Sequence, residues 1–275
     1  MSFNSQKVLI AHGLKPKKSF GQNFMMDENI NHKIAAQVKA LSSKACPIIE
    51  FGAGTGSLTK NLLSIDYPLY AIERDRDLIP ILQQTFHDFL QNQKLVLLED
   101  DAKKFAISSV CSPSKQGILV GNLPYQLTSS FIIMTIHNHE LIKGAVFLIQ
   151  KEVGQRLSAK VNSKEYGFLT VILDLFFTID MPFLVSKNCF WPIPKVDSCV
   201  VVFNKKNCTN ILTYEELIKF MEFVKIVFQK RRKKISTILN SQISSENLKN
   251  IIDPNIRPEN ITSEQFVKLF KNINI

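Results

Sequence analysis

The sequence predicts an α/β fold in which a doubly wound, mostly parallel sheet is followed by a small all-helical domain. Three observations carry this prediction. Short apolar runs typical of buried strands alternate with segments of helical spacing. A glycine-rich turn, 52–56, follows the first of these runs. Strand signals end near residue 204, and only helical patterns follow.

The elements follow one another in a β-α-β order. After a loose basic arm over residues 1–20, Asp27 can cap a helix in which Ile30, Ile34 and Val38 share one face. Strands are then predicted at 47–51, 69–72, 95–98, 118–120 and 145–149. Helices are expected at 58–63 and 77–86, after the capping residues 128–130, and at 151–159 and 166–177.

Two further apolar runs, 179–185 and 196–203, are predicted to close the sheet as strands, with an antiparallel edge. The proline-rich segment 190–195 between them predicts a loop. With a linker near 204–210, we assign residues 1–205 to the first domain and residues 206–275 to the helical one.

The net charge of this 275-residue chain is +10, and its pI is about 9.3. Such a balance favours a polyanionic partner, either nucleic acid or an anionic membrane surface. A lysine-rich proteome explains the charge equally well. The longest apolar run, 168–177, is too short to span a bilayer and contains Asp174, so we expect no membrane association.

Cysteine and histidine usage indicates neither a disulfide framework nor a metal site. The five cysteines are scattered without a C-x-x-C pair, at positions 46, 111, 189, 199 and 208. The five histidines show no metal-ligand spacing. The polar N-terminus lacks the apolar segment of a secretory signal, so we expect a protein of the reducing cytoplasm.

The glycine turn is a candidate ligand site. Gly52 and Gly54 would let a ligand approach the backbone closely, and Glu73 ends the next strand, nineteen positions after Gly54. An acid there can bind both hydroxyls of an adenosine ribose. The alternative is a glycine turn without a ligand. The G-x-G-x-G spacing favours S-adenosylmethionine over NAD.

Asp101, at the end of the third strand, is a candidate acceptor for an adenine amino group. A solvated loop acid or a helix cap is the plainer interpretation of this residue. Asp100, one position earlier, is a competing choice for the same role.

A second candidate site lies where the fourth strand ends, at Asn122, Leu123, Pro124 and Tyr125. An exocyclic base amine is a poor nucleophile because its lone pair is delocalised into the ring. The Asn122 side-chain oxygen and the Leu123 carbonyl would accept its hydrogens, Pro124 would stiffen the turn, and Tyr125 would stack on the base for roughly 1–3 kcal/mol. Alignment and electrostatic support then replace a strong general base. A structural Asn-Pro turn is the alternative.

Phe190 is a candidate to stack on the other face of that base. A core aromatic that anchors a stiff loop is the alternative, and Trp191 is a rival for the stacking role. We assign a run of five basic residues to an amphipathic helix: Lys230, Arg231, Arg232, Lys233 and Lys234. With the net charge of +10, phosphate binding by this run is favoured over the alternative, a solvated helix face. Further lysine and arginine side chains that would extend it are Lys151, Arg156, Lys160 and Lys164.

From about Lys15 to its C-terminus the chain resembles the ribosomal RNA adenine dimethyltransferases of the KsgA type. Several specific motifs in the same order carry the resemblance: Lys18-Ser-Phe-Gly-Gln-Asn-Phe24, Glu50-Phe-Gly-Ala-Gly-Thr-Gly56, Glu73-Arg-Asp-Arg-Asp77, Asp101-Ala102, Asn122-Leu-Pro-Tyr125, Gln150-Lys-Glu-Val153, Tyr166-Gly167, Phe190-x-Pro-x-Pro-Lys-Val-Asp-Ser198, Phe228-Gln-Lys-Arg-Arg-Lys233 and Arg257-Pro-Glu-Asn-Ile261.

The resemblance implies a Rossmann-like methyltransferase domain with a small helical domain. The implied reaction uses S-adenosylmethionine, leaving S-adenosylhomocysteine, to dimethylate N6 of two adjacent adenines in a hairpin loop near the 3′ end of small-subunit (16S) rRNA. The implied acceptor is an immature 30S subunit, and we expect a monomer. By motif position, the cofactor would contact Asn23, Met25, Gly52, Glu73, Asp101 and Asn122, and the target base would contact Asn122, Leu123, Tyr125 and Phe190.

Three positions depart from the family pattern: Ala53 replaces a usual proline, Asp100 a glycine and Phe168 a common arginine. Ala53 is expected to loosen the glycine turn. Three other functions compete with the implied one. They are methylation of one adenine of large-subunit RNA, a non-enzymatic role in ribosome assembly or transcription, and an NAD oxidoreductase.

Overall fold

A computed structural model describes residues 4–207 and 212–273 of the protein. The chain forms two compact units. The first holds the residues up to Gly154 together with Asp180–Lys205, and the second holds Gln155–Ile179 together with the residues from Lys206 onward. The segment 155–179, which the sequence analysis assigned to the first domain, therefore groups with the helical unit. The linker expected near 204–210 lies partly outside the described residues.

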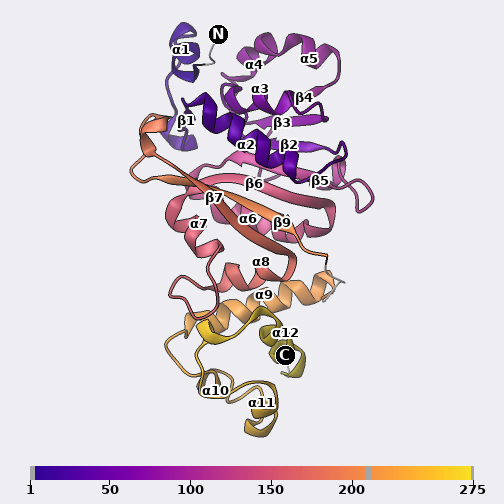
Figure 1. The fold of residues 1–275 in the computed structure, drawn as a ribbon, viewed down its shortest axis with the longest axis vertical. Helices are drawn as coiled ribbons and strands as arrows, with labels where there is room; N and C mark the ends of the chain where they lie inside the picture. Colours follow the sequence, from indigo (N-terminus) through magenta and orange to yellow (C-terminus); the bar gives the residue numbers. More distant parts are fainter. Residues whose placement is uncertain (1–3, 208–211, 274–275) are drawn as a thin grey trace. The chain divides into compact units, whose positions relative to one another are not determined.

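The predicted doubly wound, mostly parallel sheet is confirmed (Figure 1). Its seven strands lie in the order β4-β3-β2-β5-β6-β9-β7. The four neighbouring pairs from β4 to β6 are parallel, and β9 joins β6 antiparallel, as predicted for this edge. The strands are β2 (Ile48–Phe51), β3 (Leu69–Glu73), β4 (Leu95–Glu99), β5 (Gly117–Asn122), β6 (Ile142–Gln150), β7 (Phe177–Val185) and β9 (Ser198–Lys205).

Helices cover both faces of the sheet, whose central strands are buried and mostly apolar, with Glu50 of β2 as a buried exception. Ile48 packs into a buried cluster with Ile34 of α2 (Glu28–Ala40) and Leu62 of α3 (Ser57–Leu63). On the other face the ring of Phe51 stacks on that of Phe131, with centroids 4.9 Å apart, and Phe131 belongs to α6 (Thr128–His137). Strands that are buried on both faces and mostly apolar are typical of a parallel sheet between two helical layers.

The helix expected at 77–86 is present from residue 79 to residue 85, and a second short helix that was not predicted follows it at 87–91. Phe86 ends the first and precedes the second with φ −114° and ψ 25°, outside the helical region. The other helices of the sheet region lie close to their expected positions. The two helices formed here are α4 (Ile79–Thr85) and α5 (His87–Gln91), and α7 (Lys151–Leu157) follows β6.

Three N-terminal features were not predicted. The expected loose arm contains a helix, α1 (Ser5–Ala11), and a 3-10 turn, Lys18–Phe20. Beyond it, β1 (Phe24–Met25) pairs antiparallel with β8 (Phe190–Trp191) as a separate small sheet. The expected loop at 190–195 thus begins with a short strand.

The second unit is helical apart from the start of β7. In α9, Thr213 and Glu216 form a reciprocal capping box. An aromatic cluster holds the helices together, with the ring centroids of Phe220 and Phe270 5.5 Å apart. Tyr166 donates a hydrogen bond to the Ile261 carbonyl, and α8 packs against α9 and α12, which explains why 155–179 belongs here. The helices are α8 (Phe168–Phe176), α9 (Tyr214–Gln229), α10 (Ile235–Ile238), α11 (Ser245–Ile251) and α12 (Ser263–Asn272).

Within residues 4–207 and 212–273, no helix combines the length and apolar character needed to cross a bilayer. Four of the five cysteines are free thiols in this part of the chain, namely Cys46, Cys111, Cys189 and Cys199. Cys208 lies outside the described residues.

Candidate active site

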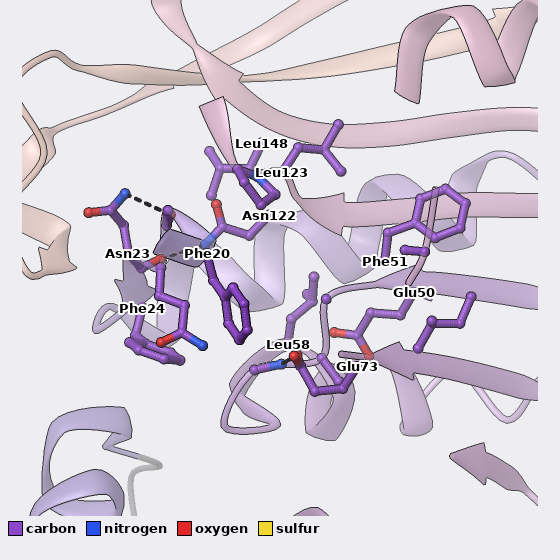
Figure 2. Close-up of a pocket in the computed structure, with 18 of the residues that line it drawn as sticks. Phe20, Asn23, Phe24, Glu50, Phe51, Leu58, Glu73, Asn122, Leu123 and Leu148 are labelled. Atoms are coloured by element: carbon purple, nitrogen blue, oxygen red, sulfur yellow. Dashed lines mark hydrogen bonds between the residues drawn. The ribbon is translucent and has the colours of Figure 1, made fainter. Parts of the chain in front are cut away.

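A cavity lies in the first unit where strands β2, β3, β4 and β5 end. The strand order reverses at β2, and the crevice outside such a reversal is where open α/β sheets bind ligands. Figure 2 shows side chains from the ends of β2, β3 and β5 around one space, and residues at the end of β4 also line it. The sequence-predicted residues that line it are Asn23, Met25, Gly52, Gly54, Glu73, Asp101, Asn122, Leu123, Pro124 and Tyr125.

The glycine turn that follows β2 supplies the floor of this cavity. Gly52 has a φ of +77°, and a Cβ atom placed there would meet no atom within 4 Å. The Ala53 N–H donates to the Ile72 carbonyl over 3.3 Å, beside the 2.8 Å bond from Gly52 to the same oxygen. A proline at position 53 has no N–H to offer. The alanine departure therefore adds a tether between the turn and β3.

Glu73 is buried at the end of β3, where Figure 2 shows it on the cavity wall, and both of its carboxylate oxygens accept backbone hydrogen bonds. Oε2 accepts from Gly54 N and Oε1 from Asp75 N, each over 2.8 Å. Burial raises the pKa of this carboxyl group, and the backbone N–H groups oppose that effect. Each oxygen keeps a second lone pair, so the group can still accept from two hydroxyls.

Asp100 and Asp101 both line the cavity, at the end of β4. Asp100 accepts the Asp101 N–H over 2.7 Å, and Asp101 Oδ1 accepts the Lys103 N–H over 3.1 Å. Asp101 is the less exposed of the two. Its role toward an adenine amino group stays a prediction.

The Asn122 side chain at the end of β5 has a fixed orientation. Its Nδ2 donates to the Asn23 carbonyl over 2.9 Å, a contact drawn in Figure 2. Because the nitrogen is used in this way, the amide oxygen remains as the acceptor of the group. The neighbouring Leu123 is anchored by its N–H, which donates to the Leu148 carbonyl over 3.1 Å.

Tyr125 is half-buried and begins a short 3-10 turn, Tyr125–Leu127, after Pro124. Its hydroxyl lies 2.7 Å from that of Ser198, a fully buried residue at the start of β9. Burial raises the pKa of the Tyr125 phenol, so the group is neutral at physiological pH. The sequence motif that ends at Ser198 was recognised, but this contact to Tyr125 was not predicted.

Phe190 does not line the cavity. Its side chain is 2% exposed and lies in the apolar cluster of α2 and the sheet, and its backbone pairs with Met25. In this structure it is a core aromatic, which is the alternative weighed for it above. The rival Trp191 packs against a small cluster of Leu9, Phe24 and neighbours. Stacking of Phe190 on a base stays a prediction, and it requires the β8 region to shift.

Sequence reasoning missed several polar residues of the cavity wall. Glu50 is 1% exposed and accepts from the Thr59 hydroxyl over 2.7 Å. Burial raises its pKa to about 8. Asn31 donates to the Ser57 hydroxyl over 2.6 Å. The acid of the glycine motif was visible in the sequence, but its burial was not.

A second group that was missed joins the N-terminal segment to β3. The Lys17 ammonium contacts the carboxylates of Asp75 and Asp77 at 2.5 and 2.6 Å, and Gln22 donates to Asp75 over 2.7 Å. These bonds raise the pKa of Lys17. Phe20, on the cavity wall, lies beneath the Arg74 guanidinium at 4.5 Å. We call these contacts of Lys17 and Gln22 with Asp75 and Asp77 the N-terminal clasp.

The basic run of the second unit does not lie on a helix. Helix α9 ends at Gln229, and the run forms the turn before α10. Arg231 is used within the unit, because it donates to the Lys164 carbonyl over 3.0 Å and lies 3.5 Å from the Glu259 carboxylate. The exposed members of the run are Lys230, Arg232, Lys233 and Lys234. Phosphate contact by them stays a prediction.

Comparison with known proteins identifies the family. Two relatives named ribosomal RNA small subunit methyltransferase A, from Mycoplasmopsis pulmonis and Clostridium botulinum, are 36% and 35% identical to this chain. The first alignment covers 94% of this chain and 98% of the relative, and the second covers 97% of each.

Solved structures agree in fold. A dimethyladenosine transferase from Plasmodium falciparum has a TM-score of 0.75 at 25% identity, covering 90% of this chain and 95% of its own. The 23S rRNA methyltransferase ErmE has a TM-score of 0.70 at 20% identity, covering 91% and 99%. The family model described as ribosomal RNA adenine dimethylase matches residues 13–274, so the chain belongs to the ribosomal RNA adenine dimethylase family.

Proposed function

We propose that the protein dimethylates N6 of two adjacent adenines near the 3′ end of small-subunit rRNA, with S-adenosylmethionine as methyl donor. The observation that carries the proposal is the fixed Asn122 amide, whose nitrogen is held by the Asn23 carbonyl at the wall of the cavity that contains Glu73 and the glycine turn. The family match and the small-subunit relatives support the choice of substrate.

The residues of the cavity fit the methyl donor. Glu73 has a spare lone pair on each oxygen for the two ribose hydroxyls, and the space above Gly52 admits a ligand against the backbone. Apolar side chains such as Phe24 and Leu58 line the walls between these polar points. Asp101 or Asp100 would accept from the adenine amino group. When bound, S-adenosylmethionine supplies an electrophilic methyl group on a positively charged sulfur.

The acceptor base is activated by position rather than by a strong base. In the first transfer Asn122 Oδ1 and the Leu123 carbonyl accept the two N6 hydrogens, and in the second transfer one of them accepts the single hydrogen that remains. These bonds let the nitrogen lone pair leave conjugation with the ring. Tyr125 stacks on the base and aligns it. Each transfer would form an N–CH3 bond as the sulfur–methyl bond of the donor breaks, and the displaced N6 proton would pass to water. The neutral Tyr125 phenol takes no part in this proton transfer.

The chain acts on ribosomal RNA, and we infer that the acceptor is an immature 30S particle in which the target hairpin is accessible. The exposed lysines and arginine of the turn between α9 and α10 would bind phosphates of that particle. The net charge of +10 supports this role.

The test incubates the protein with labelled S-adenosylmethionine and unmethylated 30S or 50S subunits, then maps the modified bases by mass spectrometry. We expect two adjacent dimethyladenosines in 30S rRNA and none in 50S rRNA. A single methylated adenine in 50S rRNA would replace this function with methylation of large-subunit RNA. Absence of label from both would contradict an rRNA methyltransferase activity.

A further inference from the structure

We propose that Ser5 of α1 is a positioning residue for the cofactor cavity, which makes α1 part of the binding machinery. The inference rests on the proposed use of the glycine turn by S-adenosylmethionine. The family match begins at residue 13, so α1, at Ser5–Ala11, precedes it. Ser5 nevertheless lines the cavity together with residues of the matched region.

The Ser5 hydroxyl joins two walls of the cavity. Thr55 Oγ1 donates to Ser5 Oγ over 2.7 Å, and Ser5 Oγ donates to the Met25 carbonyl over 3.2 Å. Ser5 is 1% exposed and Thr55 is 2% exposed, so water does not compete freely for either group. A hydroxyl has one donor hydrogen and accepts as well, which matches these two bonds.

Helix α1 is held in place independently of this hydroxyl. The Asn4 side chain caps its start by accepting the Lys7 N–H over 2.9 Å. Leu9 is 1% exposed in a cluster with Phe24, Leu78 and Ile81. Leu78 and Ile81 lie just beyond Asp75 and Asp77, which hold the N-terminal clasp. The helix therefore reaches β1, the glycine turn and the segment after β3 at once.

The hydrogen bond between Thr55 and Ser5 affects the cavity because Thr55 lies within the glycine turn. Thr55 lies between Gly54, whose N–H donates to Glu73, and Gly56, and both glycines have a positive φ. Glycine on each side leaves the backbone of the turn weakly constrained by its own sequence. The bond to Ser5 restrains Thr55, and it thereby restrains the Gly54 N–H that orients the Glu73 carboxylate.

The test measures S-adenosylhomocysteine affinity by calorimetry in the full chain, with the melting temperature of each variant. Ser5→Ala removes the hydroxyl, and we expect affinity to fall about 5- to 20-fold, the size expected when a buried hydrogen bond is lost. Thr55→Val should lower affinity to a similar extent. Thr55→Ser keeps the hydroxyl and should bind S-adenosylhomocysteine with nearly the wild-type affinity. The double variant Ser5→Ala/Thr55→Val should be no weaker than Ser5→Ala alone, because Ser5→Ala has already removed the bond between the two hydroxyls. Ser43→Ala, at an exposed serine, is the matched control.

Steady-state kinetics separate positioning from folding. We expect the KM for S-adenosylmethionine to rise in Ser5→Ala while kcat at saturating cofactor stays near the wild-type value. A lower melting temperature with unchanged affinity would overturn the inference, since Ser5 would then only anchor α1. Additive losses in the double variant would also overturn it. If the wild-type chain failed to bind S-adenosylhomocysteine, the proposed function would fall and this inference with it.

Discussion

The hydroxyl groups of Tyr125 and Ser198 lie 2.7 Å apart, although 73 positions separate the two residues in the chain. Tyr125 follows β5, and Ser198 begins β9, two strands away in the sheet. Because Ser198 is fully buried, its hydroxyl is a fixed point against which the phenol ring is held. Tyr125 can therefore contribute to methyl transfer in two ways: its ring can stack on the base, and its hydroxyl can fix the position of that ring through Ser198.

Variants of this pair distinguish the ring from the hydroxyl. Tyr125→Ala removes the stacking surface, worth about 1–3 kcal/mol, and should slow methyl transfer about 10- to 100-fold. Tyr125→Phe and Ser198→Ala each remove only the hydrogen bond and should slow transfer about 3- to 10-fold. Cofactor affinity should stay near the wild-type value in all three. Near-normal turnover of Tyr125→Ala would refute the stacking role.

Glu73 should determine cofactor affinity. Glu73→Gln replaces one carboxylate oxygen by an amide NH2 group. This NH2 group cannot accept a hydrogen bond, so it would oppose the N–H of either Gly54 or Asp75. We expect affinity for S-adenosylhomocysteine to fall about 10- to 100-fold by calorimetry. Glu99→Gln, at the exposed end of β4, is the matched control. Equal affinity of Glu73→Gln and wild type would exclude the ribose assignment.

The N-terminal clasp should also affect cofactor binding. Lys17→Met keeps the length and apolar stem of the side chain but removes the ammonium that joins Asp75 and Asp77. We expect the KM for S-adenosylmethionine to rise about 3- to 10-fold, because Gln22 and the cavity-lining Phe20 lose one of the contacts that hold them near β3. Lys15→Met, at an exposed lysine two positions away, should leave KM unchanged. A rise in both variants would point to a general charge effect.

Glu50 should make the stability of the cofactor-free protein depend on pH. Burial raises the pKa of this carboxyl to about 8, against an ordinary value of 4.5, while the Thr59 hydroxyl opposes the shift and the charge of Glu73 adds to it. Between those pH values the folded chain binds more protons at this group than the unfolded chain, so the free energy of unfolding falls as pH rises through the window. Glu50→Gln should lose this part of the slope, as followed by urea unfolding from pH 5 to 8. Identical slopes in both proteins would mean that Glu50 is ionised in the fold.

The exposed basic turn should set the salt dependence of ribosome binding. Arg232→Glu with Lys233→Glu should weaken 30S binding and reduce the slope of log affinity against log salt by about 1–2, as expected when two phosphate contacts are lost. The matched control reverses two exposed lysines elsewhere in the same unit, Lys219 and Lys249. Arg231 is left unchanged because it bonds within the unit. An equal slope for both double variants would assign the turn to a solvated face.

The sequence predicted the sheet well because the central strands are short and mostly apolar, as the uninterrupted run 118–120 illustrates. The glycines and acidic residues that follow the predicted strands, such as Gly52 and Glu73, likewise indicated where the cavity lies. Features that depend on contacts between distant segments were missed. Helix α1 is short with one deeply buried apolar residue, Leu9, and β1 and β8 have two residues each, so neither leaves a periodic pattern. Residue type alone did not distinguish a stacking Phe190 from the core residue found here.

If Asn122 holds the target base as proposed, its hydrogen bond to the Asn23 carbonyl would also select against other purines. With its nitrogen bonded to the Asn23 carbonyl, this cavity-lining side chain has its oxygen left as the acceptor for a base, and the Leu123 carbonyl would offer another. Guanine and hypoxanthine carry a keto oxygen where adenine carries its amine, so a flipped-out purine of either kind would bring a third lone-pair-bearing oxygen against these two. Repulsion among the oxygens would exclude both bases without any steric barrier. Under the proposed function, the Asn23 carbonyl would thus contribute to base selection by fixing the orientation of the Asn122 amide.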